Sequence, residues 1–273
     1  MLVVVGLGAS SCSTPQLPQV TLPPQSETAR GIVIIAHGVA ASAGSWPLRM
    51  ERSFRGLDAP LERWDFYRLE WREASLDRLA APGVGYRLGV AIGEQLVQMD
   101  YEVVHLVGHS AGAHVVHGAA DVLARERSSH GDGGGDGRTA PAVFATLIDP
   151  FVARSVVQLF WGASRFGTNV DFAENYVTRE DQVPFTNSFL DHAYNVDLTP
   201  ILAPPEDAPS NYAHMWPIDF YTDGAVGAPA GIDRSPMALL DDVTAGNARE
   251  LATVLSREFP PGAVVVPGEA APE

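Results

Sequence analysis

The segment VVHLVGHSAGAHVV at positions 103–116 constrains the fold more than any other part of this chain. Its apolar run 103–107 is typical of a strand covered on both faces, and the Ala-rich stretch 111–124 predicts a helix. Between them, GHSAG at 108–112 fits the pattern G-x-S-x-G. An abrupt turn from strand to helix needs these glycines, because side chains at the flanking positions would collide with neighbouring elements. The segment therefore places Ser110 at the apex of a strained turn.

Apolar runs and helical patterns alternate along the rest of the chain. Strands are predicted at 31–36, 64–71, 103–107, 142–148 and, more weakly, 170–177, and helices at 84–99, 111–124 and 245–259. This alternation predicts an α/β fold with a mostly parallel central sheet flanked by helices. We expect a single domain over residues 29–259, followed by a flexible C-terminal tail over 260–273.

Composition excludes several classes of function. The 273 residues carry a formal net charge of −15, which argues against a nucleic-acid partner because phosphates are neutralised by clustered Lys and Arg. The sequence contains no Lys, so Schiff-base lysines, Ser-Lys dyads and a P-loop lysine are excluded. Any nucleophile in this chain needs a different base.

The N-terminus predicts export. Residues 1–12 form a short apolar run that ends in small residues and Cys12, and they resemble a signal or lipoprotein-like segment whose cysteine is lipidated. A plain secretory signal or a frayed terminus with an incidental cysteine are the alternatives, because no basic region precedes the run. Residues 13–28 are Pro-rich and predict a linker. We therefore expect a protein that is secreted or anchored to the bacterial cell envelope, with membrane association through an N-terminal lipid.

The predicted turn gives Ser110 the surroundings of a nucleophile. At a helix N-terminus, the backbone N–H of Ala111 points toward developing negative charge. A second donor is expected from the loop after the first strand, where Gly38 lets the backbone approach a substrate and the N–H of Val39 serves as the donor.

A serine hydroxyl needs a base, and His214 fits this role best among the eight histidines. It stands in a loop-like segment after a Pro-rich stretch and before the last helix, and the order Ser, acid, His is that of α/β-hydrolases. His192 is the alternative. The remaining histidines lie before the serine, in its motif, on the following helix or in a Gly-rich loop: His37, His105, His109, His114, His117 and His130.

The acid that orients the histidine is expected to be Asp149. It ends the predicted strand at 142–148, which puts it at the carboxyl edge of the sheet where ligands bind in open α/β folds. Asp181, after the weaker strand, and Asp197 are alternatives.

No metal or other cofactor is predicted. The spacing of His109, His114 and His117 suggests a metal site only weakly, because no acidic partner is interleaved. Asp132 and Asp136, in a Gly-rich loop, resemble a calcium-binding repeat, but one copy cannot build that structure.

Five segments resemble one known family. HLVGHSAGAHV at 105–115 is similar to the elbow segment of pancreatic-type (triacylglycerol) lipases, which belong to the α/β-hydrolase superfamily. Similarity continues, in patches, in IVIIAHGVAASAGSW (32–46), LEWREAS (69–75), LIDPF (147–151) and HMWPIDFYTDG (214–224).

The resemblance implies an α/β-hydrolase fold, Asp149 as the acid, His214 as the histidine, and the Val39 and Ala111 N–H groups as the oxyanion hole. The disulfides and the C-terminal β-sandwich domain of those lipases have no counterpart in this sequence. Interfacial activation and colipase-like partners are therefore not expected.

These observations together predict a serine ester hydrolase, a lipase or carboxylesterase that acts on small-molecule or lipid esters through an acyl-enzyme. An amidase or thioesterase with the same triad is an alternative, as is an inactive α/β-hydrolase that binds ligands in the cell envelope. Either 151–168 or 182–213 is a candidate lid, and acyl chain length is not predicted.

Overall fold

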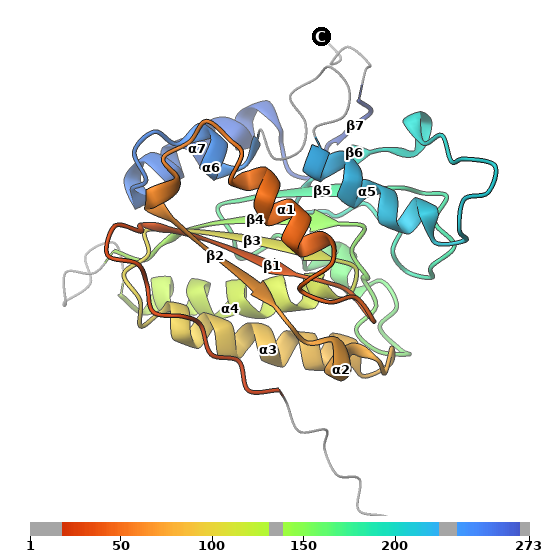
Figure 1. The fold of residues 1–273 in the computed structure, drawn as a ribbon, viewed down its shortest axis with the longest axis horizontal. Coiled ribbons are helices and arrows are strands. Elements are labelled where there is room, and N and C mark those ends of the chain that lie inside the picture. The colour runs from red at the N-terminus through yellow and green to blue at the C-terminus, as the bar shows by residue number, and fades with distance from the viewer. Residues whose placement is uncertain (1–17, 131–138, 224–233, 268–273) are drawn as a thin grey trace, which may run out of the picture.

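One parallel sheet organises the chain. The computed structural model describes residues 18–130, 139–223 and 234–267 (Figure 1). The strands are β1 (Gly31–Ala36), β2 (Trp64–Leu69), β3 (Val103–His109), β4 (Ala142–Ile148), β5 (Phe172–Val177), β6 (Tyr194–Asp197) and β7 (Val264–Val265). They lie in the order β2-β1-β3-β4-β5-β6-β7, and each neighbouring pair is parallel. The predicted α/β fold class, with a single domain, is confirmed.

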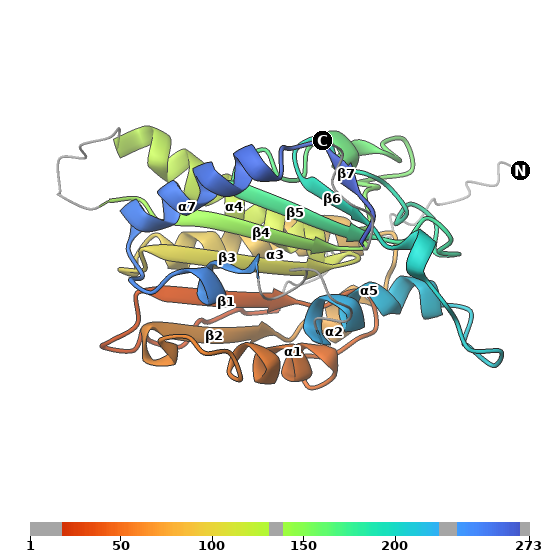
Figure 2. The ribbon, with the colours of Figure 1, turned by 90° about the horizontal axis from the view of Figure 1, so that it is seen from above.

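Helices cover both faces of the sheet. The described helices are α1 (Trp46–Phe54), α2 (Arg72–Ser75), α3 (Ala81–Leu96), α4 (Gly112–His130), α5 (Tyr212–Asp223), α6 (Pro236–Leu239) and α7 (Ala245–Glu258). Helices α3 and α4 lie on one face (Figure 1), and α1, α5, α6 and α7 lie on the other, as the view from above shows (Figure 2).

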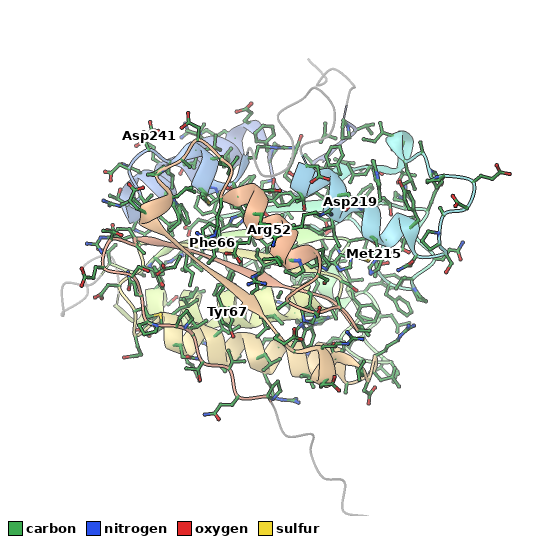
Figure 3. All side chains as sticks on the ribbon, in the orientation of Figure 1. Arg52, Phe66, Tyr67, Met215, Asp219 and Asp241 are labelled. Carbon is green, nitrogen blue, oxygen red and sulfur yellow. The ribbon has the colours of Figure 1, made fainter. Side chains whose placement is uncertain are left out.

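The strands contribute alternate residues to two hydrophobic cores, as the two-residue period of a strand requires. In β1, Ile32 and Ile34 join the core beneath α3 and α4, whereas Val33 and Ile35 join the core beneath α1, α5 and α7. The edge strand β2 follows the same rule, because Phe66 packs against the second core and Tyr67 against the first (Figure 3). Strands buried on both faces explain the continuous apolar runs of the sequence.

The prediction that His214 lies in a loop is wrong, because residues 212–223 form helix α5. Pro217 lies inside this helix and cannot donate to the carbonyl of Ala213, four residues earlier. That carbonyl instead accepts a hydrogen bond from the Thr178 hydroxyl at 2.9 Å. A contact with a distant part of the chain therefore supports a helix that the local sequence argues against.

Several further elements were not predicted, namely α1, α2, α6, β6 and β7. Helix α1 buries Trp46, Met50 and Phe54, whose spacing of four residues is helical. Strand β6 spans four residues, and β7 adds two residues to the sheet inside the segment expected to be a flexible tail. Both strands are too short to show a clear alternation in sequence.

The described part of the N-terminal region lies against the domain. Leu22, within the predicted linker, is buried in the first core, and its N–H donates to Gln95 Oε1 at 2.9 Å. Cys12 and most of the Gly-rich loop, with Asp132 and Asp136, lie outside the described residues, so lipidation and export stay predictions. Among the residues that the structure describes, no helix has the length and apolar character needed to cross a bilayer.

Candidate active site

Ser110 stands at a strained turn between β3 and α4. Its φ is 54°, a left-handed conformation that non-glycine residues rarely adopt. A Cβ at Gly108 would lie 2.7 Å from Val116 Cγ2, and one at Gly112 would lie 2.2 Å from the Ala36 carbonyl oxygen. A side chain at either flanking position would therefore collide with a neighbouring element, as the sequence predicts.

Backbone hydrogen bonds fix this turn to the end of β4. The Ser110 N–H donates to the carbonyl of Ile148 at 3.0 Å, and the Ser110 carbonyl accepts from the Phe151 N–H at 3.0 Å. Phe151 follows Asp149 by two residues, so the nucleophile candidate and the acid candidate sit on one rigid unit.

His214 lies in the first turn of α5 and is bound through one ring nitrogen. Its Nδ1 lies 2.6 Å from Asp149 Oδ2 and 2.9 Å from Asp181 Oδ2. A ring nitrogen that donates in this way is protonated in the neutral imidazole as well. Nε2 therefore remains as the nitrogen that can take a proton. The imidazole also packs against the His109 ring, with 4.5 Å between the ring centroids and 43° between the ring planes, and the His109 Nε2 lies 3.1 Å from the His214 carbonyl oxygen.

Two acids approach His214 from neighbouring strands. Asp149 directly follows β4, is fully buried, and has a φ of 42°. Asp181 lies beyond the end of β5 and is also buried. The structure thus brings the favoured acid and one of its alternatives to the same nitrogen. Asp197, the other alternative, ends β6 and accepts from the Thr199 N–H instead, at 3.0 Å.

Burial and hydrogen bonding set the charges of this group. Burial alone lowers the pKa of His214, but the hydrogen bonds and charges of Asp149 and Asp181 raise that pKa to about 9. Burial raises the pKa of Asp149 well above its usual range, and the bond to His214 offsets this only in part. Burial also raises the pKa of Asp181, but hydrogen bonds from His214, Asp149 and Thr186 outweigh it and lower this pKa to about 2.

The loop after β1 passes directly over the turn. A Cβ at Gly38 would lie 2.8 Å from Ser110 Cβ, so only glycine fits there. In the described part of the chain, neither the Val39 N–H nor the Ala111 N–H donates to a protein acceptor, whereas the next amide, of Ala40, donates to Ser75 Oγ at 3.3 Å. The amides of Val39 and Ala111 are therefore both available beside Ser110.

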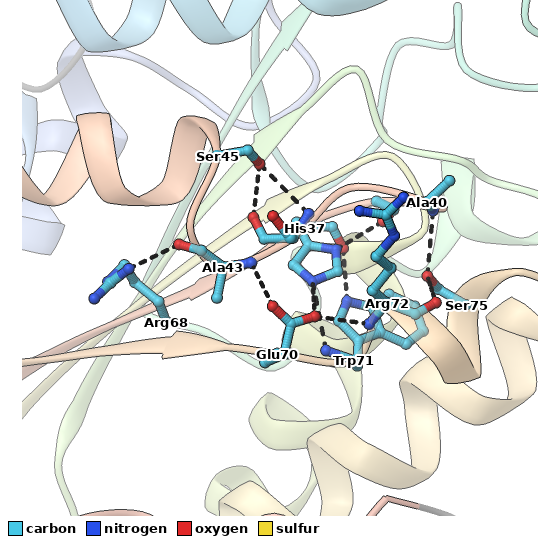
Figure 4. Close-up of polar contacts among 11 residues, drawn as sticks. His37, Ala40, Ala43, Ser45, Arg68, Glu70, Trp71, Arg72 and Ser75 are labelled. Atoms are coloured by element: carbon cyan, nitrogen blue, oxygen red, sulfur yellow. Dashed lines mark hydrogen bonds and ion pairs between the residues drawn. The ribbon is translucent and has the colours of Figure 1, made fainter.

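A polar network that the sequence analysis missed holds this loop in place (Figure 4). Trp71 Nε1 donates to the His37 carbonyl at 2.9 Å, and the Glu70 carboxylate accepts from the N–H groups of Ala43 and Arg72 at 2.9 and 3.0 Å. These residues follow β2, the neighbour of β1 in the sheet. Adjacent parallel strands end at the same edge of the sheet. The position of these residues directly after a strand could therefore have identified them as neighbours of the loop after β1.

These elements enclose a pocket of about 200 Å³. Its walls come from the loop after β1, the turn at Ser110, helix α5 and four connecting segments: Gly38, Val39, Ala40, Ala41, Arg78, His109, Ser110, Ala111, Phe151, Val183, Asn211, His214 and Met215. Two larger hollows, of about 580 and 620 Å³, are lined by other segments and include none of the predicted site residues. Of the two candidate lids, 151–168 contributes Phe151 to this pocket and 182–213 contributes Val183 and Asn211.

Four of the other histidines do not line this pocket, namely His105, His114, His117 and His192. His105 and His114 are fully buried, and desolvation lowers the pKa of each to about 3. His114 and His117 pack with the aromatic rings of Trp161 and Phe166. His192 is exposed and does not line the pocket, whereas His214 does.

The group of Asp149, Asp181 and His214 offers one ligand atom per residue, all within 4.8 Å of one another. Metal ligands could be arranged in this way, but the two distances from Nδ1 are hydrogen-bond lengths. A proton on Nδ1 therefore accounts for the arrangement.

The sequence matches no protein-family model and no curated protein. Similar folds occur among solved structures. The lin2722 product of Listeria innocua has 15% identity and a TM-score of 0.45, over 74% of this chain and 96% of that one. A protein proposed to be a carboxylesterase from Lactobacillus plantarum has 15% identity and a TM-score of 0.39, over 89% and 90%. A protein proposed to be a cell surface hydrolase from the same species has 14% identity and a TM-score of 0.40, over 74% and 94%.

Proposed function

We propose that this chain is a serine hydrolase of the α/β-hydrolase type that cleaves carboxylic esters. One observation carries the proposal. A serine in a strained strand-to-helix turn and a histidine bound to buried carboxyl groups line the same small pocket. The combination of an activated nucleophile, a base and an orienting acid is the arrangement required for acyl transfer.

In the proposed reaction, the Ser110 hydroxyl oxygen attacks the ester carbonyl carbon while His214 Nε2 takes the hydroxyl proton. The negative charge that develops on the carbonyl oxygen accepts hydrogen bonds from the N–H groups of Val39 and Ala111. Collapse of this intermediate breaks the bond to the alcohol, which leaves with the proton from His214. Water, deprotonated by His214, then hydrolyses the acyl-serine to give the acid and free Ser110.

The decisive test compares Ser110→Ala with Ser128→Ala. Ser128 is an exposed serine on α4 whose hydroxyl donates to the Ala124 carbonyl, so it is a matched control. We expect wild type and Ser128→Ala to hydrolyse p-nitrophenyl acetate and to react with a fluorophosphonate, and Ser110→Ala to lose about 10⁴-fold or more in kcat and all labelling. Unchanged turnover and labelling in Ser110→Ala would refute the proposal.

The same geometry suits other acyl groups, so substrates of three classes complete the test. Matched ester, thioester and amide substrates should give the highest kcat/KM with the ester. The amide should be slowest, because a leaving amine requires more assistance from His214 than a leaving alcohol. A thiol leaves more readily than an alcohol, so a preference for the ester over the thioester would reflect how the pocket binds the substrate and not the leaving group. A preference for the amide or thioester would assign the alternative hydrolase function. Fluorophosphonate labelling without turnover of any of the three would favour a binding role.

A further inference from the structure

His214 Nδ1 faces more acceptors than it can serve. It carries one proton, yet carboxylate oxygens from Asp149 and Asp181 lie at 2.6 and 2.9 Å. Both acids are buried, and a carboxylate oxygen of each lies within 4.8 Å of one from the other. Two negative charges in contact at a buried site repel strongly, so such a pair retains one proton over a wide range of pH.

Each carboxyl group is independently held in place. Asp149 Oδ1 accepts from the Thr178 N–H at 3.2 Å. Asp181 Oδ1 accepts from the Val183 N–H at 2.9 Å, and its Oδ2 accepts from the Thr186 hydroxyl. Because neither acid depends on the other for its position, removing the charge of one leaves the second beside Nδ1.

We propose that Asp181 is a second positioning acid and that Asp149 and Asp181 act as one unit, which holds a single proton and a single negative charge against His214. This inference rests on the proposed function. It changes the expected role of Asp149, because the acid function is divided between the ends of β4 and β5 instead of belonging to one residue.

Substitution by Asn tests the division, since Asn has the shape of a protonated Asp. Asp149→Asn and Asp181→Asn should each lower kcat/KM for p-nitrophenyl acetate by no more than about 30-fold, whereas the double variant should lose about 10⁴-fold, as expected when a triad loses its acid. Such a strongly non-additive result would measure the coupling of the pair. A single variant as inactive as the double variant would overturn the proposal, because that residue would then be the sole acid.

The pH dependence tests the shared proton. If the wild-type pair carries one negative charge, each single variant keeps that charge, and the acidic limb of kcat/KM stays near its wild-type position. The double variant has no charge, so its limb moves to lower pH. If the acidic limb of the kcat/KM profile shifts to lower pH in both single variants, the wild-type pair carries two negative charges, and the sharing of a proton is refuted. Asp197→Asn is the matched control, because Asp197 also ends a strand but binds the Thr199 N–H.

A measurement on the resting protein separates this inference from the proposed function. The low-field NMR signal of the His214 Nδ1 proton should persist in both single variants and vanish in the double variant, whether or not any ester is cleaved. Loss of the signal in one single variant would identify a sole acid. Asp181→Ser serves if Asp181→Asn does not fold, because it removes the charge with a smaller side chain. Failure of Ser110 labelling in wild type, with these signals intact, would refute only the hydrolase proposal.

Discussion

Backbone strain is concentrated at individual residues of the site. In the described part of the chain, the non-glycine residues with positive φ are Ala40, Ser110, Asp149 and Phe185. The first three belong to the loop after β1, the nucleophile turn and the acid, and Phe185 packs against Phe151 in the pocket wall. Such conformations cost on the order of 1–3 kcal/mol each and persist where the surrounding structure fixes them. The strain therefore supports the assignment of this region as the functional site.

Gly38 makes the sharpest prediction for a single residue. In Gly38→Ala the new methyl group would collide with Ser110 and push the Val39 N–H away from the developing charge, so we expect kcat to fall by about 10²-fold or more, as for loss of an oxyanion donor. Gly44→Ala, in the same loop, is the control, because a Cβ there would meet nothing within 4 Å. Steady-state kinetics beside thermal melts would show the effect, and equal activity in the two variants would contradict it.

The charge of His214 predicts an alkaline pH dependence. The active form is the neutral imidazole, and the Asp149 and Asp181 contacts raise the pKa of His214 from 6.5 to about 9. Below this pKa the neutral fraction increases with pH, so kcat/KM should rise through the interval from 6.5 to about 9 and then level off. At each pH, the rate measured with Ser110→Ala is subtracted from the wild-type rate to correct for hydrolysis by hydroxide. A plateau already reached below pH 6.5 would exclude the raised pKa.

At the scale of elements, the sequence carried strong signals for some parts and weak ones for others. Buried strands and the GHSAG turn have local patterns, so β1, β3, β4 and α4 could be predicted. Helix α5 could not, because Pro217 argues against a helix and the compensating bond comes from Thr178, 35 residues away. Asp181 remained an alternative for a similar reason. Its role depends on how β4 and β5 pair, which no local pattern contains.

The support of α5 by Thr178 gives a prediction at this scale. Thr178→Val removes the only side-chain donor recorded for the Ala213 carbonyl among the described residues, and should lower the free energy of unfolding by about 1–3 kcal/mol. In a Pro217→Ala background, the new backbone N–H at position 217 can donate to that carbonyl. Thr178→Val should therefore lower the free energy of unfolding by less in this background. Denaturant unfolding of the four proteins measures the difference. Thr253→Val is the control, because its exposed hydroxyl bonds to Arg249 within α7. Equal losses in both backgrounds would contradict the compensation.

The site exists only at the scale of the whole molecule. Strands β1, β2, β3, β4 and β5 each deliver a residue or loop of the site just past their carboxyl ends: Gly38, Glu70, Ser110, Asp149 and Asp181. The strand order, in which β1 lies between β2 and β3 and the strands from β3 onward follow in sequence order, brings these ends together. A sequence can predict that such residues share an edge of the sheet. The distance of each acid from His214 depends on packing across that edge.

The size of the assembled pocket predicts the preferred substrate. At about 200 Å³ it is smaller than the 300–1,000 Å³ of typical drug-sized sites, so p-nitrophenyl acetate and butyrate should exceed the decanoate in kcat/KM by at least about tenfold, with all esters kept below micelle formation. Met215, labelled in Figure 3, lines the pocket and should limit the length of the acyl chain, so Met215→Ala should shift the optimum to longer chains. Met99→Ala, a half-buried methionine outside this pocket, should not. A wild-type preference for the decanoate would show that the acyl chain lies outside the pocket.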